Sequence, residues 1–285
     1  ILFIVGSIVA TAAGYAVYRM TSSVDVTAIS GNREALRVMS CVIFCLLFGI
    51  IGFIDDFAKV AKKQNEGLTP KQKLALQVVA AILWLAAMYW LGDRSTTIDL
   101  VFVRFDIRWF YYPVMVLVIL YLTNAVNLTD GVDGLCGTVT LVAMLIFTLI
   151  CSRLQMTSYT LFTMALAGGC LGFLVWNLHP AKCFMGDTGS MFLGAAVASV
   201  GLATHQHLVL ILVALVYILE ALSVMIQVTY FKYTKKKYGE GRRIFKMTPI
   251  HHHFEMSGFS EYKIVITFSL FGLIAGAVGL LLVTL

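Results

Sequence analysis

Long uninterrupted apolar runs are the feature that most constrains this chain of 285 residues. Each run approaches or exceeds the roughly 20 residues that a helix needs to cross the hydrocarbon core of a bilayer. Charged residues make up only 13% of the sequence, whereas a soluble domain carries about 25%. We therefore expect an all-α polytopic membrane protein, because lipid requires every backbone amide to be satisfied within its own segment.

Nine candidate spans follow from the positions of these runs, and we expect them to form one membrane domain over residues 1–285. They lie at about 1–18, 36–54, 73–92, 111–127, 135–151, 158–176, 189–204, 207–230 and 262–284. The run 207–230 is longer than a bilayer requires, which predicts that it tilts or bends. Partial alternation of apolar residues from Thr97 to Arg108 predicts a small outer hairpin.

The distribution of basic residues sets the orientation. If the N-terminus lies inside, every lysine falls on the inner face and only arginines fall on the outer one, as the positive-inside rule requires. The same orientation puts three acidic stretches and a run of histidines on the inner face. The count of basic residues did not require that agreement, and it is the main reason to expect one site there.

The net charge of +6 and the six cysteines do not change this interpretation. The basic residues flank the spans, which indicates topology and anionic lipid rather than nucleic acid. The cysteines lie mostly inside apolar runs and lack paired spacing, which is typical of small buried hydrophobic residues. Neither a disulfide framework nor a zinc site is expected.

The first acidic stretch, Phe53–Lys59, puts two adjacent carboxylates at the end of an apolar run. If the run is a helix, its dipole disfavours the charges of Asp55 and Asp56 by about 0.3–1 kcal/mol each. Lys59 or a bound metal is the candidate for the compensating positive charge. Taken alone, the stretch fits a solvated helix end equally well.

Two further stretches place acids beside apolar runs. Asp130 and Asp133 would share a face on a helical turn, and the glycine after each lets a ligand approach the backbone. Asp187 stands just before a span, where it could simply cap the helix. Five carboxylates on one face would repel each other unless cations join them. Oxygen ligands without cysteine suit Mg²⁺, which with nearby lysines would support phosphoryl transfer; the candidate lysines are Lys59, Lys71 and Lys182.

The string Pro249–Glu255 contains three consecutive histidines, His251, His252 and His253. Neighbours on a helix point in different directions, so the three do not suit one zinc ion, whose histidines are usually three to five residues apart. Imidazoles near phosphate oxygens are the better functional hypothesis, and a polar loop held by hydrogen bonds is the alternative. Glu220 is costly in mid-span unless paired, and we expect it to contact a neighbouring element rather than relay protons.

Together these motifs resemble those of the polyprenyl-phosphate N-acetylhexosamine-1-phosphate transferase superfamily. The stretches 53–59, 124–135 and 184–190 look like its acidic motifs. The string 249–255 looks like one peculiar to the bacterial phospho-N-acetylmuramoyl-pentapeptide transferases, and the resemblance covers essentially the whole chain. That family has ten spans, so the resemblance implies that this chain starts at the second one and lacks the first.

The resemblance implies that undecaprenyl phosphate attacks the β-phosphate of UDP-N-acetylmuramoyl-pentapeptide, with Mg²⁺ required. The products would be lipid I and UMP, in the first membrane step of peptidoglycan synthesis. It also implies a homodimer in the bacterial plasma membrane with its active site on the cytoplasmic face. The nearest alternative is a sibling transferase that uses UDP-N-acetylglucosamine, against which the histidine string argues. A transporter built around Glu220 and a silent lipid-binding scaffold are more distant alternatives.

The resemblance also assigns roles to residues. Asp187 resembles the Mg²⁺ ligand, while Asp55 and Asp56 resemble the pair that deprotonates the lipid phosphate or attacks directly. The three histidines complete the implied catalytic set. The implied substrate-binding residues are Lys59, Lys71, Asn124, Asn127, Asp130, Asp133, Asn177 and Phe184, of which Phe184 would stack on uracil.

Overall fold

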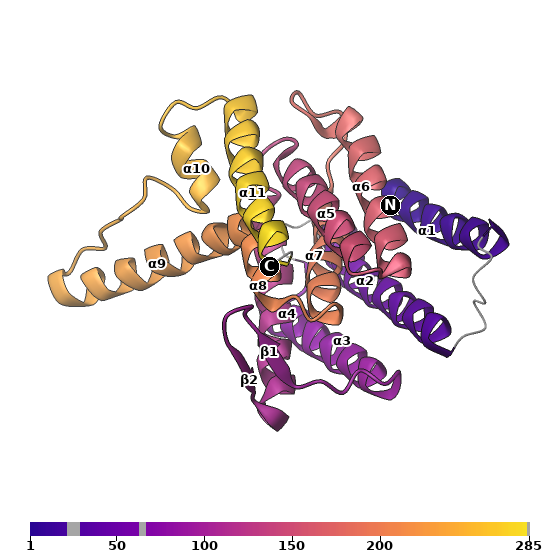
Figure 1. The fold of residues 1–285 in the computed structure, drawn as a ribbon. Helices are drawn as coiled ribbons and strands as arrows, with labels where there is room; N and C mark the ends of the chain where they lie inside the picture. The colour runs from indigo at the N-terminus through magenta and orange to yellow at the C-terminus, as the bar shows by residue number, and fades with distance from the viewer. Residues whose placement is uncertain (22–28, 63–66, 284–285) are drawn as a thin grey trace.

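The computed structural model describes residues 1–21, 29–62 and 67–283, so Lys63, one of the lysines expected inside, lies outside the described part. The helices are α1 (Leu2–Thr21), α2 (Ile29–Lys62), α3 (Pro70–Trp90), α4 (Tyr111–Thr129), α5 (Leu135–Arg153), α6 (Thr157–Asn177), α7 (Gly186–Ala203), α8 (His207–Val213), α9 (Leu215–Tyr238), α10 (Ile250–Glu255) and α11 (Glu261–Val283). A short 3₁₀-helix, η1 (Arg108–Phe110), precedes α4. The predicted all-α membrane architecture is confirmed (Figure 1).

Helix α7 is the centre of the bundle, with α2 packed on one side and α4 on another, while α5 packs against α6 and α11. Its side chains are buried from Gly189 to Ala203, and most of them are small. Small residues let neighbouring helices approach closely. A Cβ on Gly194, for example, would lie only 2.8 Å from Cα of Thr123 in α4. Close packing of α2, α4 and α7 therefore brings the ends of these helices together.

Within the described part, eight helices are long and apolar enough to cross a membrane. The predicted span 189–204 coincides with α7, which is not among the eight, so the expected number of nine exceeds the observed number by one. The reason is physical: α7 is enclosed by other helices, and its many small residues make it less apolar than a helix that faces lipid.

The bend predicted for 207–230 is present, because α8 ends at Val213 and α9 begins at Leu215. Beyond this break α9 leaves the bundle as a separate arm (Figure 1). The predicted hairpin is also confirmed: β1 (Thr97–Asp99) pairs antiparallel with β2 (Arg104–Asp106). All six cysteines are free. Five are buried, as their positions predicted, whereas Cys183 is exposed.

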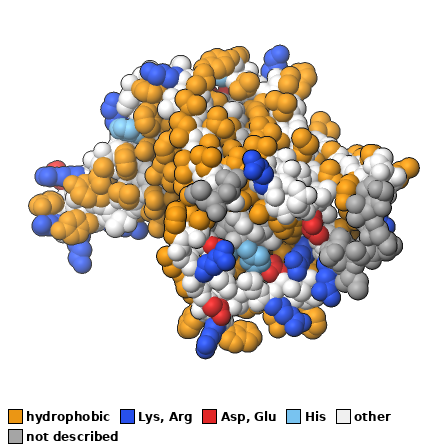
Figure 2. Space-filling model, in the orientation of Figure 1, with side chains coloured by type: hydrophobic (Ala, Val, Ile, Leu, Met, Phe, Trp, Pro, Cys, Tyr) orange, Lys and Arg blue, Asp and Glu red, His pale blue; other side chains and the backbone are white. Residues whose placement is uncertain are grey.

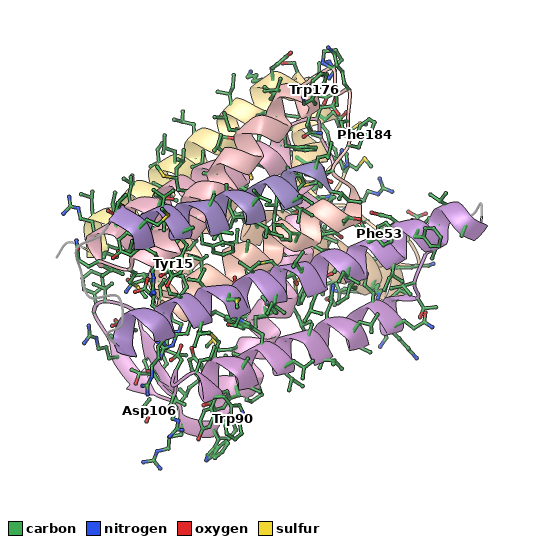
Figure 3. The ribbon with its side chains drawn as sticks, turned by 90° about the vertical axis from the view of Figure 1, so that its right-hand side faces the viewer. Tyr15, Phe53, Trp90, Asp106, Trp176 and Phe184 are labelled. Carbon is green, nitrogen blue, oxygen red and sulfur yellow. The ribbon has the colours of Figure 1, made fainter. Side chains whose placement is uncertain are left out.

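The bundle has two ends with different side chains. Figure 3 shows Phe53, Trp176 and Phe184 toward one end. Trp90 of α3 and Asp106 of the hairpin lie toward the other end. Hydrophobic side chains cover much of the face seen in Figure 2, as expected for a surface in contact with lipid. The end that carries Phe53 and Phe184 also carries the acidic stretches, and we refer to it below as the acidic end.

Candidate active site

Three carboxylates from two helices meet at the acidic end. Asp55 and Asp56 lie in the last turns of α2, and Asp187 lies in the first turn of α7, where the helix dipole favours negative charge. One oxygen of each carboxylate lies within 4.8 Å of the others, a spacing that suits a shared metal ion. Glycine at position 52 permits this approach, because a side chain there would collide with the backbone of Asp187.

Two lysines neutralise part of this charge. Lys59 Nζ lies 2.8 Å from Asp55 Oδ2 and 3.2 Å from Asp187 Oδ2. Lys73 Nζ, from α3, lies 2.8 Å from Asp187 Oδ2 and 3.7 Å from Asp55 Oδ2. Three carboxylates with two ammonium groups leave one negative charge uncompensated, which favours binding of a further cation.

Hydrogen bonds hold each carboxylate in place. The backbone amide of Leu68 donates to Asp55 Oδ1 at 2.7 Å. Thr188 donates to Asp56 Oδ2 from its amide at 3.1 Å and from its hydroxyl at 3.2 Å. Because of these bonds the oxygens are oriented before any ligand arrives, which lowers the cost of binding one.

Two asparagines of α4 face this region. Asn127 Nδ2 donates to Asp187 Oδ1 at 2.9 Å and to Ser190 Oγ at 2.8 Å, so it contacts the carboxylate cluster directly. Asn124, one turn earlier, exchanges hydrogen bonds of 2.9 and 3.3 Å with Gln77 of α3. Asn124 therefore ties α4 to the helix that carries Lys73.

Asp130 follows α4 directly and lies at the edge of the cluster. Burial, and then the negative charges of Asp187 and Asp56, raise the pKa of Asp130 from 3.8 to about 7. A cation bound by the carboxylates would oppose that shift. Asp130 therefore belongs electrostatically to the same site.

Asp133 lies in a different cluster, which we call the latch and which also contains His179 and Glu261. Asp133 Oδ2 accepts from the amide of Ala181 at 2.9 Å and lies 3.2 Å from His179 Nδ1. The same nitrogen lies 3.1 Å from Glu261 Oε1. Residues 130–134 form a non-helical turn, so the shared face expected for Asp130 and Asp133 is not formed and the two acids have different neighbours.

Asn177 is the last residue of α6, and Phe184 lies in the connector from α6 to α7. Asn177 is buried, accepts from the amide of Gly134 at 3.2 Å and donates to the carbonyl of Cys183 at 2.8 Å. Asn177 therefore joins the turn of residues 130–134, which we call the acidic turn, to the connector between α6 and α7. Phe184 is 77% exposed at the acidic end (Figure 3), and its ring is available to stack on a planar group.

The other two predicted lysines are not part of the cluster. Lys71 is exposed in the first turn of α3, and no ion pair links its described side chain to the three carboxylates. Lys182 Nζ lies 5.7 Å from the centre of the Trp176 ring, a cation–π distance. The sequence analysis did not assign Lys73 to the site. Helical geometry could have indicated it, because Lys73 and Gln77 lie one turn apart on the same face of α3.

The three histidines have three different partners, as consecutive positions on a helix predict. The pairs are His251 Nδ1 with Glu220 Oε2 at 3.0 Å, His252 Nδ1 with Glu255 Oε2 at 2.8 Å, and His253 Nδ1 with the amide of Lys246 at 3.1 Å. His251 is fully buried, whereas the other two are partly exposed. The expectation that Glu220 contacts a neighbouring element is confirmed.

The chain is similar to known proteins over most of its length. Residues 38–205 match the family model described as glycosyl transferase family 4. The chain is 43% identical over 241 residues to a phospho-N-acetylmuramoyl-pentapeptide-transferase from Halalkalibacterium halodurans, covering 84% of this chain and 72% of that relative. Relatives of the same name from Listeria welshimeri and Acetivibrio thermocellus are 42% and 44% identical, over 89% and 81% of this chain and 77% and 69% of theirs.

Proposed function

The chain belongs to glycosyl transferase family 4, and on that premise we propose that it transfers phospho-N-acetylmuramoyl-pentapeptide from its UDP-linked form to undecaprenyl phosphate. The products are lipid I and UMP. Support comes from relatives that carry the name of this activity and align over most of the chain. A membrane enzyme suits the reaction, because a soluble nucleotide and a long isoprenoid can bring their phosphates together only at the interface.

The observation that carries this proposal is the convergence of Asp55, Asp56 and Asp187 beside two lysines. The donor set consists of oxygens without cysteine and keeps an uncompensated negative charge, which fits Mg²⁺. Asp187 is the metal ligand in this proposal, and the Asp55–Asp56 pair lies beside it. When bound, Mg²⁺ would neutralise charge on the diphosphate of the nucleotide.

Phosphoryl transfer then needs a base and positive groups. An oxygen of the lipid phosphate attacks the β-phosphorus, the bond from that phosphorus to the bridging oxygen breaks, and UMP leaves. The Asp55–Asp56 pair accepts the proton of the lipid phosphate. Asp56 is the better placed of the two, because its side chain is 33% exposed against 6% for Asp55. Lys59 and Lys73 stabilise the charge that develops on the phosphate oxygens.

The nucleotide is recognised by residues around the acidic turn. Phe184 stacks on uracil, and Asp130 lines the same pocket. Asn177 and Asp133 contribute by holding the loops of this pocket together. Asn127 and the partly exposed histidines of α10 contact phosphates and sugar in this proposal. Asn124 supports this region through its hydrogen bonds to Gln77.

The proposed orientation puts the acidic end on the cytoplasmic face of the bacterial plasma membrane. Its support is the distribution of lysines, which all fall on that side of the sequence-derived topology. The isoprenoid tail lies along α9 in this proposal, because apolar side chains such as Met225 and Ile226 are exposed there. A homodimer is proposed from family resemblance.

The test is UMP release by the purified chain in Mg²⁺, with each UDP-sugar, in the presence and absence of undecaprenyl phosphate. We expect release only when UDP-N-acetylmuramoyl-pentapeptide and the lipid phosphate are both present. Release with UDP-N-acetylglucosamine instead would identify the chain as the sibling transferase. Release that does not depend on the lipid would contradict direct attack by its phosphate and support a covalent aspartyl intermediate.

A further inference from the structure

A fully buried acid in α9 lies outside the carboxylate cluster. Glu220 has no exposed surface, although an acid within a membrane-spanning helix is costly unless it is paired. Its partner is His251 of α10, which is equally buried. Glu220 Oε2 lies 3.0 Å from the ring Nδ1 of His251 and 3.4 Å from its backbone nitrogen. The acid therefore orients both the ring and the start of α10.

The pairing determines which ring nitrogen carries a hydrogen. A carboxylate only accepts, so Nδ1 of His251 is the protonated position and Nε2 points the opposite way. Nε2 faces Gly131 so closely that a Cβ at position 131 would collide with it. Nε2 of His251 and Oε1 of Glu220 have no hydrogen-bond partner among the described residues. The ring of His251 thus packs against the acidic turn at Gly131.

We propose that Glu220 is a positioning residue of the transfer reaction, which acts through His251 and Gly131 on the turn that carries Asp130. The inference rests on the proposed function. The chain of contact runs from α9 through α10 to the acidic turn, and Asp130 directly precedes Gly131. Because the carboxyl of Asp130 lies at the edge of the cluster, movement of the turn changes how the nucleotide is held.

The first test is the steady-state kinetics of Glu220→Gln and Gly131→Ala. We expect each substitution to raise the KM for UDP-N-acetylmuramoyl-pentapeptide by about 10- to 100-fold, with kcat changed by less than about threefold. Loss of folded protein would instead lower kcat and leave KM unchanged, and that result would overturn the proposal. The matched control is Ser223→Ala, because Ser223 is buried on the next turn of α9 and donates to the carbonyl of Glu220 rather than to its carboxylate.

The second test replaces His251 with asparagine and, separately, with glutamine. Asparagine places its amide nitrogen near the position of Nδ1 and can still donate to Glu220, whereas the glutamine amide reaches toward Nε2. We expect His251→Asn to keep a lower KM than His251→Gln by about tenfold. The reverse order would overturn the proposal. Glu220→Gln combined with His251→Gln should raise KM no more than the stronger single substitution, because the two residues act as one unit.

The third test is independent of turnover. The chain contains only six histidines, so the ¹⁵N spectrum of a histidine-labelled sample has few ring signals, and His251→Asn identifies the one from His251. We expect that signal to show a protonated Nδ1 and to move in Glu220→Gln. An unprotonated Nδ1 would overturn the proposal. If the unsubstituted chain released no UMP, the proposed function would fail, while this spectrum would still report on the pair.

Discussion

The acidic end holds two groups of side chains that could bind a metal ion, and the two groups have different partners. Asp55, Asp56 and Asp187 share two lysines and keep one negative charge uncompensated. In the latch, by contrast, the described partners of the two acids are one imidazole nitrogen and the backbone amides of Ala181 and Asp133.

The latch also joins three separate segments. Asp133 belongs to the turn after α4, His179 to the connector after α6, and Glu261 to the first turn of α11. The hydroxyl of Tyr262 adds a hydrogen bond to the carbonyl of His179. Ligand-type residues at metal distance are therefore not sufficient to define a site. The two lysines, which can also contact phosphate, distinguish the proposed reaction centre from a connection that holds loops together.

Of the changes that would test this comparison, removal of divalent cations should have the largest effect on UMP release. We expect UMP release to fall below detection in excess chelator and to return with added Mg²⁺, because the carboxylate cluster otherwise repels the diphosphate. The midpoint of thermal unfolding, to which the latch contributes, should change much less. Activity that persists in chelator would contradict the proposed role of Mg²⁺.

Asp187→Asn should come next, with kcat lower by about 10³-fold, because the substitution keeps the shape of the side chain and removes its charge. The matched change in the latch is Asp133→Asn, for which we expect a loss of less than about tenfold in kcat. Equal losses in UMP release by the two variants would contradict the distinction between the clusters.

Lys73→Met and Lys71→Met form a closer comparison on one helix. Loss of Lys73 should lower kcat/KM by about 10- to 100-fold, because a charge-assisted contact to the carboxylates and phosphates disappears. Loss of Lys71 should cost less than about threefold, since its side chain is exposed away from the cluster. If Lys71→Met were the more damaging, the site would extend over the exposed side of α3, as the family resemblance implies.

The smallest effect is expected for Glu261→Gln. This change weakens the contact to His179, and we expect it to lower the free energy of unfolding by about 0.5–1 kcal/mol, because the acid is partly exposed. The measurement is the midpoint of thermal unfolding, read beside UMP release at saturating nucleotide. Loss of activity without a lower midpoint of thermal unfolding would indicate that the latch is part of the reaction centre.

Local features of the sequence were sufficient for most of the fold. Most spans were predicted within a few residues, because the length of an apolar run and the signals at its ends act over one or two turns. The exceptions are 36–54, which is shorter than α2, and 207–230, which is divided between α8 and α9. Thr69 and Gln72 form a capping box with Pro70 at the first position of α3, and Gly134 adopts a left-handed conformation (φ 76°) before α5. The mid-span acid Glu220 likewise indicated a partner, because lipid makes an unpaired charge costly.

The convergence of acids from distant stretches was also predictable, since topology assigns their helix ends to one face. Which side chains meet there was decided by packing. The rotation of α3 brings Lys73 rather than Lys71 to Asp187, and the turn after α4 separates Asp130 from Asp133. These choices depend on how closely helices approach α7, through contacts between residues more than a hundred positions apart. Periodicity within one segment carries no information about them, so the sequence alone determined which end of the membrane bundle carries the acids, and the tertiary structure decided which of them act together.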